Sequence, residues 1–321
     1  MTTQMDKARV RVRQLVSAHD ELTLWDESPI QSATNAVLYG SCHDERIVYK
    51  VFERPYRKHQ DERQLQWLSS SGVVPKLYPY DFEDVLVMTC LPGEMLYKAE
   101  ESATPAVKSS LHRQVGVGLA TMMQHAYIPG DDDNEWINPH TDDIFWNSTF
   151  ETFFDTVIND SFAAIAFQKM NQPQLQQALE HLQSARSEIL DQRVFMHSDD
   201  IHGANIIVYD GVLQGFFDFE MSRLGNELYL LGATLQWACL SNPTQWQPML
   251  SGYEDARGER LSADMLRLLK LFVPFQNLIR FAEYWGSDDQ PDWVWERNAR
   301  ERTLSQLIEL LDGVDTVMRD Q

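Results

Sequence analysis

The sequence predicts an α+β fold in which a small β-rich lobe, residues 1–93, precedes a larger and mainly helical lobe, residues 94–321. Short apolar and β-branched runs separated by turn residues fill the first part, whereas long stretches with helical spacing begin near Thr104. Between them, Leu91-Pro-Gly93 ends a regular element because proline and glycine interrupt both helices and strands. A chain of 321 residues is long enough for two lobes with cores of their own.

The first lobe is expected to alternate between helix and strand. Amphipathic spacing favours helices, and runs of valine, isoleucine and tyrosine bounded by glycine, asparagine or serine favour strands. The serines before Gly72 are expected to end the second helix. In chain order we expect a helix over residues 5–20, strands over 36–39 and 46–52 joined by residues 40–45, a helix over 56–70, and strands around 76–80 and 84–89.

The second lobe is expected to be helical, with one hairpin inside it. Two apolar runs, residues 194–208 and 212–219, flank Tyr209-Asp-Gly211, a sequence typical of a tight hairpin turn. Helical patterns cover most of the remainder. The expected helices are residues 106–125, 147–170, 174–190, 229–240, 263–285 and 293–318.

The composition disfavours several classes of partner. A net charge of −21 disfavours binding to nucleic acid and to anionic membranes, and it suits a cationic small-molecule substrate, although it is equally explained as an aid to solubility. No apolar run reaches the roughly 20 residues of a membrane span. Neither a secretory signal nor a cysteine framework is visible, so a cytoplasmic location is expected. The oligomeric state is not predicted.

Oxygen-bearing side chains gather at one end of the predicted hairpin. Asp200 and Asn205 precede its first strand, and Asp218 follows its second strand in Gly-Phe-Phe-Asp-Phe-Glu220. Such oxygen ligands, together with phosphate oxygens, are what Mg²⁺ uses in phosphoryl-transfer sites. An aspartate that does not bind the metal can orient an attacking hydroxyl group and accept its proton. The hairpin therefore predicts a site for metal-dependent phosphoryl transfer.

These motifs resemble those of the aminoglycoside phosphotransferase and choline kinase family, which has a bilobal protein-kinase-like fold. The run Ser198-Asp-Asp-Ile-His-Gly-Ala-Asn205 resembles the family's His-Gly-Asp-Leu-His-Pro-Gly-Asn loop, and Phe217-Asp-Phe-Glu220 resembles its Ile-Asp-Phe/Trp-Glu segment. Gly225-Asn-Glu-Leu-Tyr229 is similar to the Gly-Asp-Pro-x-Tyr that follows there. The resemblance extends from about Gln31 to Ala238.

The resemblance implies roles for the hairpin residues. Asp200 would be the catalytic base, Asn205 and Asp218 would bind Mg²⁺, and Glu220 would add a further contact near the metal. If the family's leading histidine is instead matched to His197, the base becomes Asp199, but the spacing to Asn205 favours Asp200. The chain departs from the family at Ser198, where a histidine is usual, and at Leu230, where an aspartate is usual.

The resemblance also implies an ATP clamp in the first lobe. The segment containing Thr34 and Asn35 resembles the phosphate-covering turn, without its usual glycine, and Lys50 matches the strand lysine that pairs with the α- and β-phosphates. Glu62 is expected to form the ion pair with Lys50, and Asp61 is the competitor. The backbone groups of Thr89 and Leu91, just before Gly93, are expected to contact adenine.

Together these features predict an ATP-dependent small-molecule kinase. Only residues 219–228 separate Asp218 from the next expected helix, which leaves no room for the activation segment of a protein kinase. An aminoglycoside-type antibiotic is the first acceptor candidate, and choline, ethanolamine, thiamine or a sugar is the alternative. Acidic stretches with tryptophans, residues 130–136 and 283–296, would suit a cationic acceptor or would simply be solvated surface. A nucleotide-binding pseudokinase is the remaining alternative, favoured by the missing glycine of the phosphate-covering turn and by the departures at Ser198 and Leu230.

Overall fold

The structure is a computed structural model that describes residues 4–25, 30–31, 35–128, 149–159, 180, 182–198, 200–238, 243–266 and 268–269. Contacts between residues divide the chain into two compact units. The first unit comprises Met1–Ile128, Met196–Ser222 and Gln247–Gly258, and the second comprises Pro129–Phe195, Arg223–Trp246 and Glu259–Gln321. The lobe boundary at Gly93 stays a prediction.

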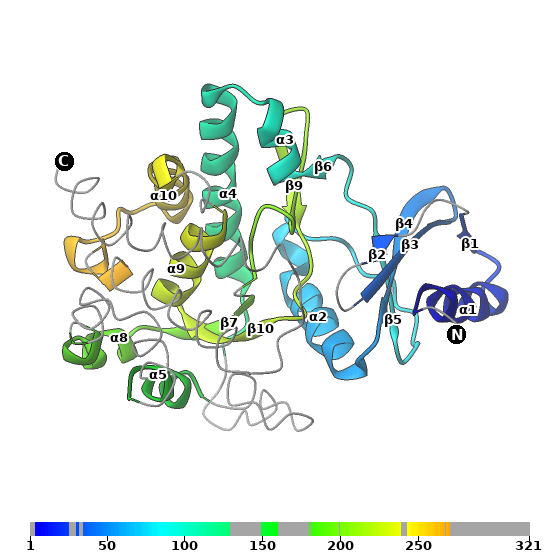
Figure 1. The fold of residues 1–321 in the computed structure, drawn as a ribbon, viewed down its shortest axis with the longest axis horizontal. Helices are drawn as coiled ribbons and strands as arrows, with labels where there is room; N and C mark the ends of the chain where they lie inside the picture. Colours follow the sequence, from blue (N-terminus) through cyan, green and yellow to red (C-terminus); the bar gives the residue numbers. More distant parts are fainter. Residues whose placement is uncertain are drawn as a thin grey trace, which may run out of the picture. The chain divides into compact units, whose positions relative to one another are not determined.

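An antiparallel sheet forms the N-terminal part of the first unit (Figure 1). Its strand order is β1-β3-β4-β5, and β2 also pairs with β3. A two-residue turn joins β3 to β4, since Cys42 pairs with Glu45, so the connection is shorter than the expected 40–45. The strands are β1 (Leu22–Leu24), β2 (Ile30–Gln31), β3 (Asn35–Cys42), β4 (Glu45–Phe52) and β5 (Val85–Thr89).

The prediction of a regular strand at residues 76–80 is wrong. Only an isolated bridge between Leu77 and Met88 forms there, next to β5. The hydrogen bonds from Tyr78 N to Val87 O and from Thr89 N to Lys76 O keep the segment beside β5. Pro79 has no N–H group with which to continue the ladder, which explains why the pairing stops.

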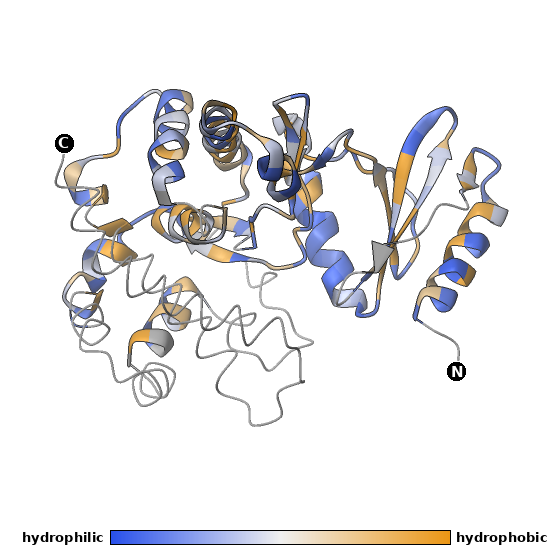
Figure 2. Cartoon of the chain, turned by 45° about the horizontal axis from the view of Figure 1, so that its top comes forward, coloured by the Kyte–Doolittle hydropathy of each residue, from blue (hydrophilic) through white to orange (hydrophobic). Residues whose placement is uncertain are grey.

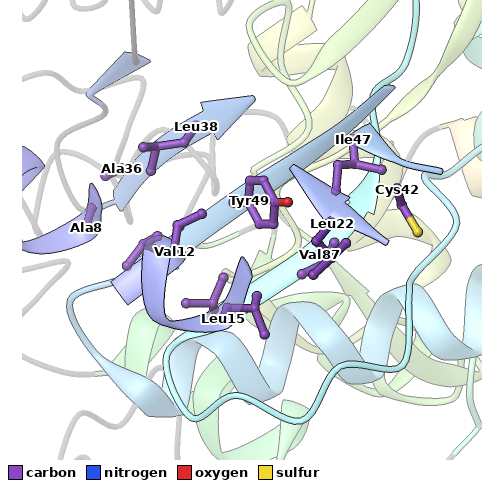
Figure 3. Packing of buried hydrophobic residues seen from close by; sticks show 12 residues of the cluster. Ala8, Val12, Leu15, Leu22, Ala36, Leu38, Cys42, Ile47, Tyr49 and Val87 are labelled. Carbon is purple, nitrogen blue, oxygen red and sulfur yellow. The ribbon is translucent and has the colours of Figure 1, made fainter. Parts of the chain in front are cut away.

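One face of this sheet packs against α1 (Gln4–Ala18), the helix expected at residues 5–20. Alternate residues of each strand point to this face, as the period of a β-strand requires. Figure 3 shows Tyr49 of β4 among aliphatic side chains from the helix and its neighbouring strands. The buried cluster consists of Ala8, Val12, Leu15, Leu22, Ala36, Leu38, Cys42, Ile47, Tyr49, Val51, Val85 and Val87.

The intervening positions of β3 and β4, some of them polar, lie on the other face of the sheet, because successive side chains of a strand point to opposite faces. Asn35 and Lys50 are such positions, and both are buried. Near them lies α2 (Pro55–Trp67), which continues into the short helix η1 (Leu68–Ser71) and confirms the helix expected at 56–70. Hydrophilic residues dominate α2 (Figure 2). Lys58, Asp61 and Gln64 of α2 are buried, so polar contacts fix this helix.

The rest of the first unit carries the predicted hairpin. β8 (Ile206–Tyr209) and β9 (Val212–Phe216) pair in antiparallel fashion around Asp210 and Gly211, whose φ values of 49° and 73° are those that tight hairpin turns require. β6 (Glu94–Met95) adds a third strand beside β8. The helices here are α3 (Leu96–Ser102), α4 (Pro105–His125) and α10 (Trp246–Arg257).

The described part of the second unit is mainly helical. It contains α5 (Phe150–Asn159), α8 (Arg186–Leu190), α9 (Glu227–Ala238) and the short helix η3 (Pro243–Gln245). The helix expected over 174–190 is interrupted at Ala185, where the backbone leaves the helical conformation before α8 begins. β7 (Val194–Ser198) and β10 (Ser222–Asn226) form a separate two-stranded sheet. Most of the helices expected after residue 263 lie outside the described residues.

No helix in the described ranges is both long enough and apolar enough to cross a membrane.

Candidate active site

Lys50 is the centre of a buried ionic cluster. Its side chain projects from β4 on the face opposite to α1, and the residue is 5% exposed. Its Nζ atom lies 2.5 Å from Oδ2 of Asp61, 2.6 Å from Oδ1 of Asp218 and 3.5 Å from Oε2 of Glu220. The predicted strand lysine and the predicted metal aspartate are thus brought into direct contact.

The expected ion pair between Lys50 and Glu62 is wrong. Glu62 pairs with Lys58, at 2.9 Å between Oε2 and Nζ, and Asp61 takes its place at Lys50. The reason is the phase of α2. Asp61 is fully buried on the same side of the helix as Leu65 and Leu68, whereas Glu62 is rotated about 100° toward solvent.

Asp218 occupies an unusual backbone conformation just after β9. Its φ of 68° lies in the left-handed region, which aspartate tolerates better than most residues. The following residue, Phe219, donates its backbone N–H to Oδ1 of Asp61 at 3.1 Å. Asp61 therefore holds both Lys50 and the segment that carries Asp218, one with each carboxylate oxygen.

Glu220 extends the cluster to two further elements. Its Oε1 accepts a hydrogen bond from Nη1 of Arg57 at 2.7 Å, and its Oε2 accepts one from Nδ2 of Asn35. Glu220 and Asn35 are 5% and 2% exposed, so both contacts are shielded from water. The side chain of Asn35 thus contacts the Asp218–Glu220 segment, and its contact with phosphate stays a prediction.

The cluster has surplus negative charge. Three carboxylates, those of Asp61, Asp218 and Glu220, meet two cations, Lys50 and Arg57. Burial by itself lowers the pKa of Lys50, but the carboxylates outweigh burial and raise this pKa above its ordinary value. Burial raises the pKa of Asp61 to about 6, so this carboxyl is still ionised at neutral pH.

Glu220 is ionised as well. Burial works to raise the pKa of its carboxyl, but Lys50, Asn35 and Arg57 outweigh burial and hold that pKa below its ordinary value. A buried cluster with one unbalanced negative charge favours the approach of a further cation.

The loop from Asp200 to Asn205 is ordered by hydrogen bonds within itself. Nδ2 of Asn205 donates to the backbone carbonyl of Asp200 at 2.9 Å, and the backbone N–H of Asn205 donates to the carbonyl of His202 at 2.8 Å. Nδ1 of His202 accepts the N–H of Ala204 at 3.2 Å, and Nδ2 of Asn205 lies 3.2 Å from the other ring nitrogen, Nε2. That atom is 3.7 Å from Oδ1 of Asp200, so His202 braces the loop.

The hairpin brings Asn205 close to the Asp218 segment. The backbone N–H of Phe217, the residue before Asp218, donates to the carbonyl of Asn205 at 3.1 Å. On its other side the loop is held by α3, because the N–H of Tyr97 donates to the carbonyl of Gly203 at 3.2 Å. Asp200 itself remains accessible, with 31% of its side chain exposed.

The segment predicted to contact adenine connects β5 to β6. The backbone N–H of Thr89 already donates to Lys76, which leaves the Thr89 carbonyl as the backbone group for the predicted contact. Gly93 has a φ of 118°, and a Cβ atom there would lie 2.1 Å from the carbonyl oxygen of Val208 in β8. The absence of a side chain at Gly93 thus allows the strand after Leu91 to approach the hairpin. The contacts of Thr89 and Leu91 with adenine stay predictions.

Among the predicted site residues, Lys50, Asn35 and Asp218 meet in one cluster, and Asp200 and Asn205 share the adjoining loop. Thr34 and the alternative base Asp199 lie outside the described residues. The sequence predictions missed Arg57, although it stands four residues before Asp61 and hence on the same side of α2.

A comparison with known families decides the assignment. The family model described as the phosphotransferase enzyme family matches residues 28–269, which contain all of these residues. The chain belongs to the phosphotransferase enzyme family. It is an ATP-dependent phosphotransferase with an alcohol group as acceptor, and the resemblance seen in the sequence motifs is confirmed.

Solved structures similar to this phosphotransferase share its fold. Aminoglycoside phosphotransferase APH(2'')-Ib, solved with ADP, is 12% identical over 94% of this chain and 98% of its own, with a TM-score of 0.57. A thermostable mutant of aminoglycoside phosphotransferase APH(4)-Ia, in complex with AMP-PNP and hygromycin B, is 10% identical over 94% and 97%, with a TM-score of 0.61. Plasmodium vivax ethanolamine kinase is 10% identical over 96% and 90%, also at 0.61.

At such identities the likeness shows the fold, which is kinase-like, with an antiparallel sheet in the N-terminal region and a helical C-terminal part. The predicted fold class is confirmed. No curated protein matches the sequence.

Proposed function

We propose that this phosphotransferase transfers the γ-phosphoryl group of ATP to a hydroxyl group of a cationic small molecule, with Asp200 as the base. The observation that carries the proposal is the cluster around Lys50, in which a strand lysine is held 2.5 Å from a helix carboxylate and 2.6 Å from Asp218. A lysine and an acidic side chain in this arrangement serve phosphate binding and metal binding in kinase-like enzymes.

Asn205 and Asp218 are the residues that would hold Mg²⁺. Both offer oxygen donors at the same end of the hairpin, and the unbalanced negative charge of the cluster fits a divalent cation. Nδ2 of Asn205 is used by the Asp200 carbonyl, so Oδ1 is the amide atom that fits a cation. Two protein ligands leave most positions around Mg²⁺ free, so phosphate oxygens would complete the ligand set. When bound, Mg²⁺ neutralises charge on the phosphates.

Lys50 and Asp200 have separate roles in the proposed reaction. Lys50 stays protonated in its cluster and offers a fixed positive charge to the phosphates of ATP. The loop of Asp200 presents its carboxylate at the surface, where it would orient the acceptor hydroxyl and take its proton as the new O–P bond forms. The phosphoryl group leaves ADP and ends on the acceptor oxygen.

Two observations support a cationic acceptor. The net charge of −21 attracts positively charged amines and repels anionic compounds. The similar structures include one with the aminoglycoside hygromycin B and one described as an ethanolamine kinase, and both names denote compounds with amino and hydroxyl groups. An aminoglycoside-type compound is the first candidate, and a smaller amino alcohol is the second.

A coupled assay of ADP release against an acceptor panel tests the proposal. The panel should include aminoglycosides, macrolides, choline, ethanolamine, thiamine and neutral sugars, each with Mg²⁺ and ATP. We expect turnover with an amine-bearing acceptor and none with the Asp200→Asn variant. Activity only on neutral sugars would contradict the cationic acceptor. Binding of ATP without turnover of any compound would favour the pseudokinase alternative.

A further inference from the structure

Arg57 stands apart from the residues that the proposed reaction uses, yet it is part of their cluster. It lies in the first turn of α2, and its Nη1 donates to Oε1 of Glu220 at 2.7 Å. The side chains of Arg57 and Glu220 are 17% and 6% exposed, so this is not a solvated surface pair. Paired charges shielded from water interact more strongly than those on the surface.

The contact joins three segments that are distant in the sequence. Glu220 follows Asp218 by two residues, Arg57 precedes Asp61 by four on α2, and Asn35 lies in β3 and donates to the other oxygen of Glu220. Arg57 thus reaches the Asp218 segment from the same helix that supplies the partner of Lys50.

Glu220 also lies close enough to compete with Asp61 and Asp218 for the side chain of Lys50. Its Oε2 lies 3.5 Å from Nζ, against 2.5 Å for Asp61 and 2.6 Å for Asp218. With Arg57 on Oε1 and Asn35 on Oε2, Glu220 has partners of its own. Without Arg57, a buried carboxylate would lose its nearest charged partner, and Lys50 would be the nearest remaining cation.

We propose that Arg57 is a positioning residue that neutralises Glu220 and so keeps Lys50 between Asp61 and Asp218. This inference rests on the proposed function, in which Lys50 binds the phosphates of ATP. Loss of Arg57 would draw Lys50 toward Glu220 and out of reach of the phosphates. It follows that the harm done by losing Arg57 depends on the charge of Glu220.

The test measures the affinity of the full chain for Mg·AMP-PNP by calorimetry. Arg57→Met should weaken binding by about tenfold or more, as is usual when a partner that orients a site residue is lost. Arg57→Lys should restore part of the loss, because it keeps the charge without the planar fork. In the double variant Arg57→Met/Glu220→Gln, most of the affinity should return, since the competing charge is gone.

Arg63→Met is the matched control, because Arg63 is on the same helix and its guanidinium contacts Trp67 instead of the cluster. Thermal unfolding verifies that each variant is folded. If Arg57→Met does not fold, the affinity of Arg57→Lys is the result that is compared with the wild type. Unchanged affinity in Arg57→Met, or losses that multiply in the double variant, would overturn the inference. A wild-type chain that does not bind Mg·AMP-PNP would overturn the proposed function itself.

Discussion

The Nζ atom of Lys50 lies 2.5 Å from Oδ2 of Asp61, while the adjacent Glu62 pairs with Lys58. Asp61 uses its second oxygen to accept the N–H of Phe219. A single carboxylate therefore connects β4, α2 and the segment that carries Asp218. This connection makes Asp61, rather than its neighbour, the acidic partner on which the nucleotide site depends.

Replacement of Asp61 and of Glu62, each by its amide, tests that assignment. Asp61→Asn should weaken Mg·AMP-PNP binding by about tenfold or more, because Lys50 loses its nearest counter-charge and one of its two closest contacts. Glu62→Gln removes one negative charge from the same helix and should leave binding close to wild type. Calorimetric titration measures both. A larger loss in Glu62→Gln than in Asp61→Asn would show that the pairing is different in solution.

The loss of stability caused by replacing Lys50 should depend on pH. In the wild type, burial opposes the ionisation of Glu220, but Lys50, Asn35 and Arg57 outweigh burial and lower the pKa of its carboxyl. The ionised carboxylate therefore adds to the stability of the folded protein above the ordinary pKa of a carboxyl, and this stabilisation is lost as the pH falls. Lys50→Met leaves buried carboxylates without their cation, which should cost roughly 3–5 kcal/mol of unfolding free energy at neutral pH.

The difference between the two proteins should shrink toward acid pH, because protonation of the carboxyls relieves the variant. Urea denaturation of both proteins at several pH values from neutral to mildly acidic measures it. A difference that grows as the pH falls would contradict the charge assignment.

Gly93→Ala should disturb the strand that follows the predicted adenine segment. The added Cβ would lie 2.1 Å from the Val208 carbonyl oxygen, and the φ of 118° is one that alanine rarely adopts. Gly258→Ala is a matched control, since Gly258 also has a positive φ, of 82°, but has nothing within 4 Å of a Cβ. The control should cost about 1–2 kcal/mol for the left-handed backbone, and Gly93→Ala should cost more. Equal losses in urea denaturation would show that β6 and β8 are less close than described.

Asn226→Asp should destabilise the second unit even though the family motif usually has an aspartate here. Asn226 is fully buried; its Oδ1 accepts the N–H of Tyr229 at 3.0 Å, and its Nδ2 donates to the carbonyl of Ile189 at 2.8 Å. A carboxylate keeps the first contact but offers no donor for the second. The expected loss is about 1–3 kcal/mol at neutral pH, and less at low pH, where a protonated carboxyl can donate. Denaturation at two pH values measures it; a variant as stable as wild type at neutral pH would contradict this account.

Several elements could be predicted because local sequence determines them. Tyr209-Asp-Gly211 indicates its turn, since Asp210 and Gly211 both adopt positive φ there. The spacing within residues 56–70 and 106–125 indicates helices, and both are present. The closeness of Asn205 and Asp218 followed from the hairpin, whose strand ends lie side by side.

What the sequence predictions missed depends on contacts between distant segments. The choice between Asp61 and Glu62 is decided by which side of α2 is buried, and the spacing of Asp61 to Leu65 and Leu68 was the available signal. The pair of Arg57 and Glu220 joins residues far apart in the chain, so no local pattern indicates it. The short β6 and α3 have too few residues for a clear period, and they form beside β8.

The measurement that tests the central claim most directly is the activity of Asp200→Asn alongside its nucleotide affinity. With the acceptor found in the ADP-release screen, we expect this variant to lose Mg·ATP-dependent phosphorylation while it still binds Mg·AMP-PNP like wild type, because Asp200 acts on the acceptor hydroxyl and not on ATP. Retained phosphorylation in Asp200→Asn, together with its loss in Asp199→Asn, would contradict the account.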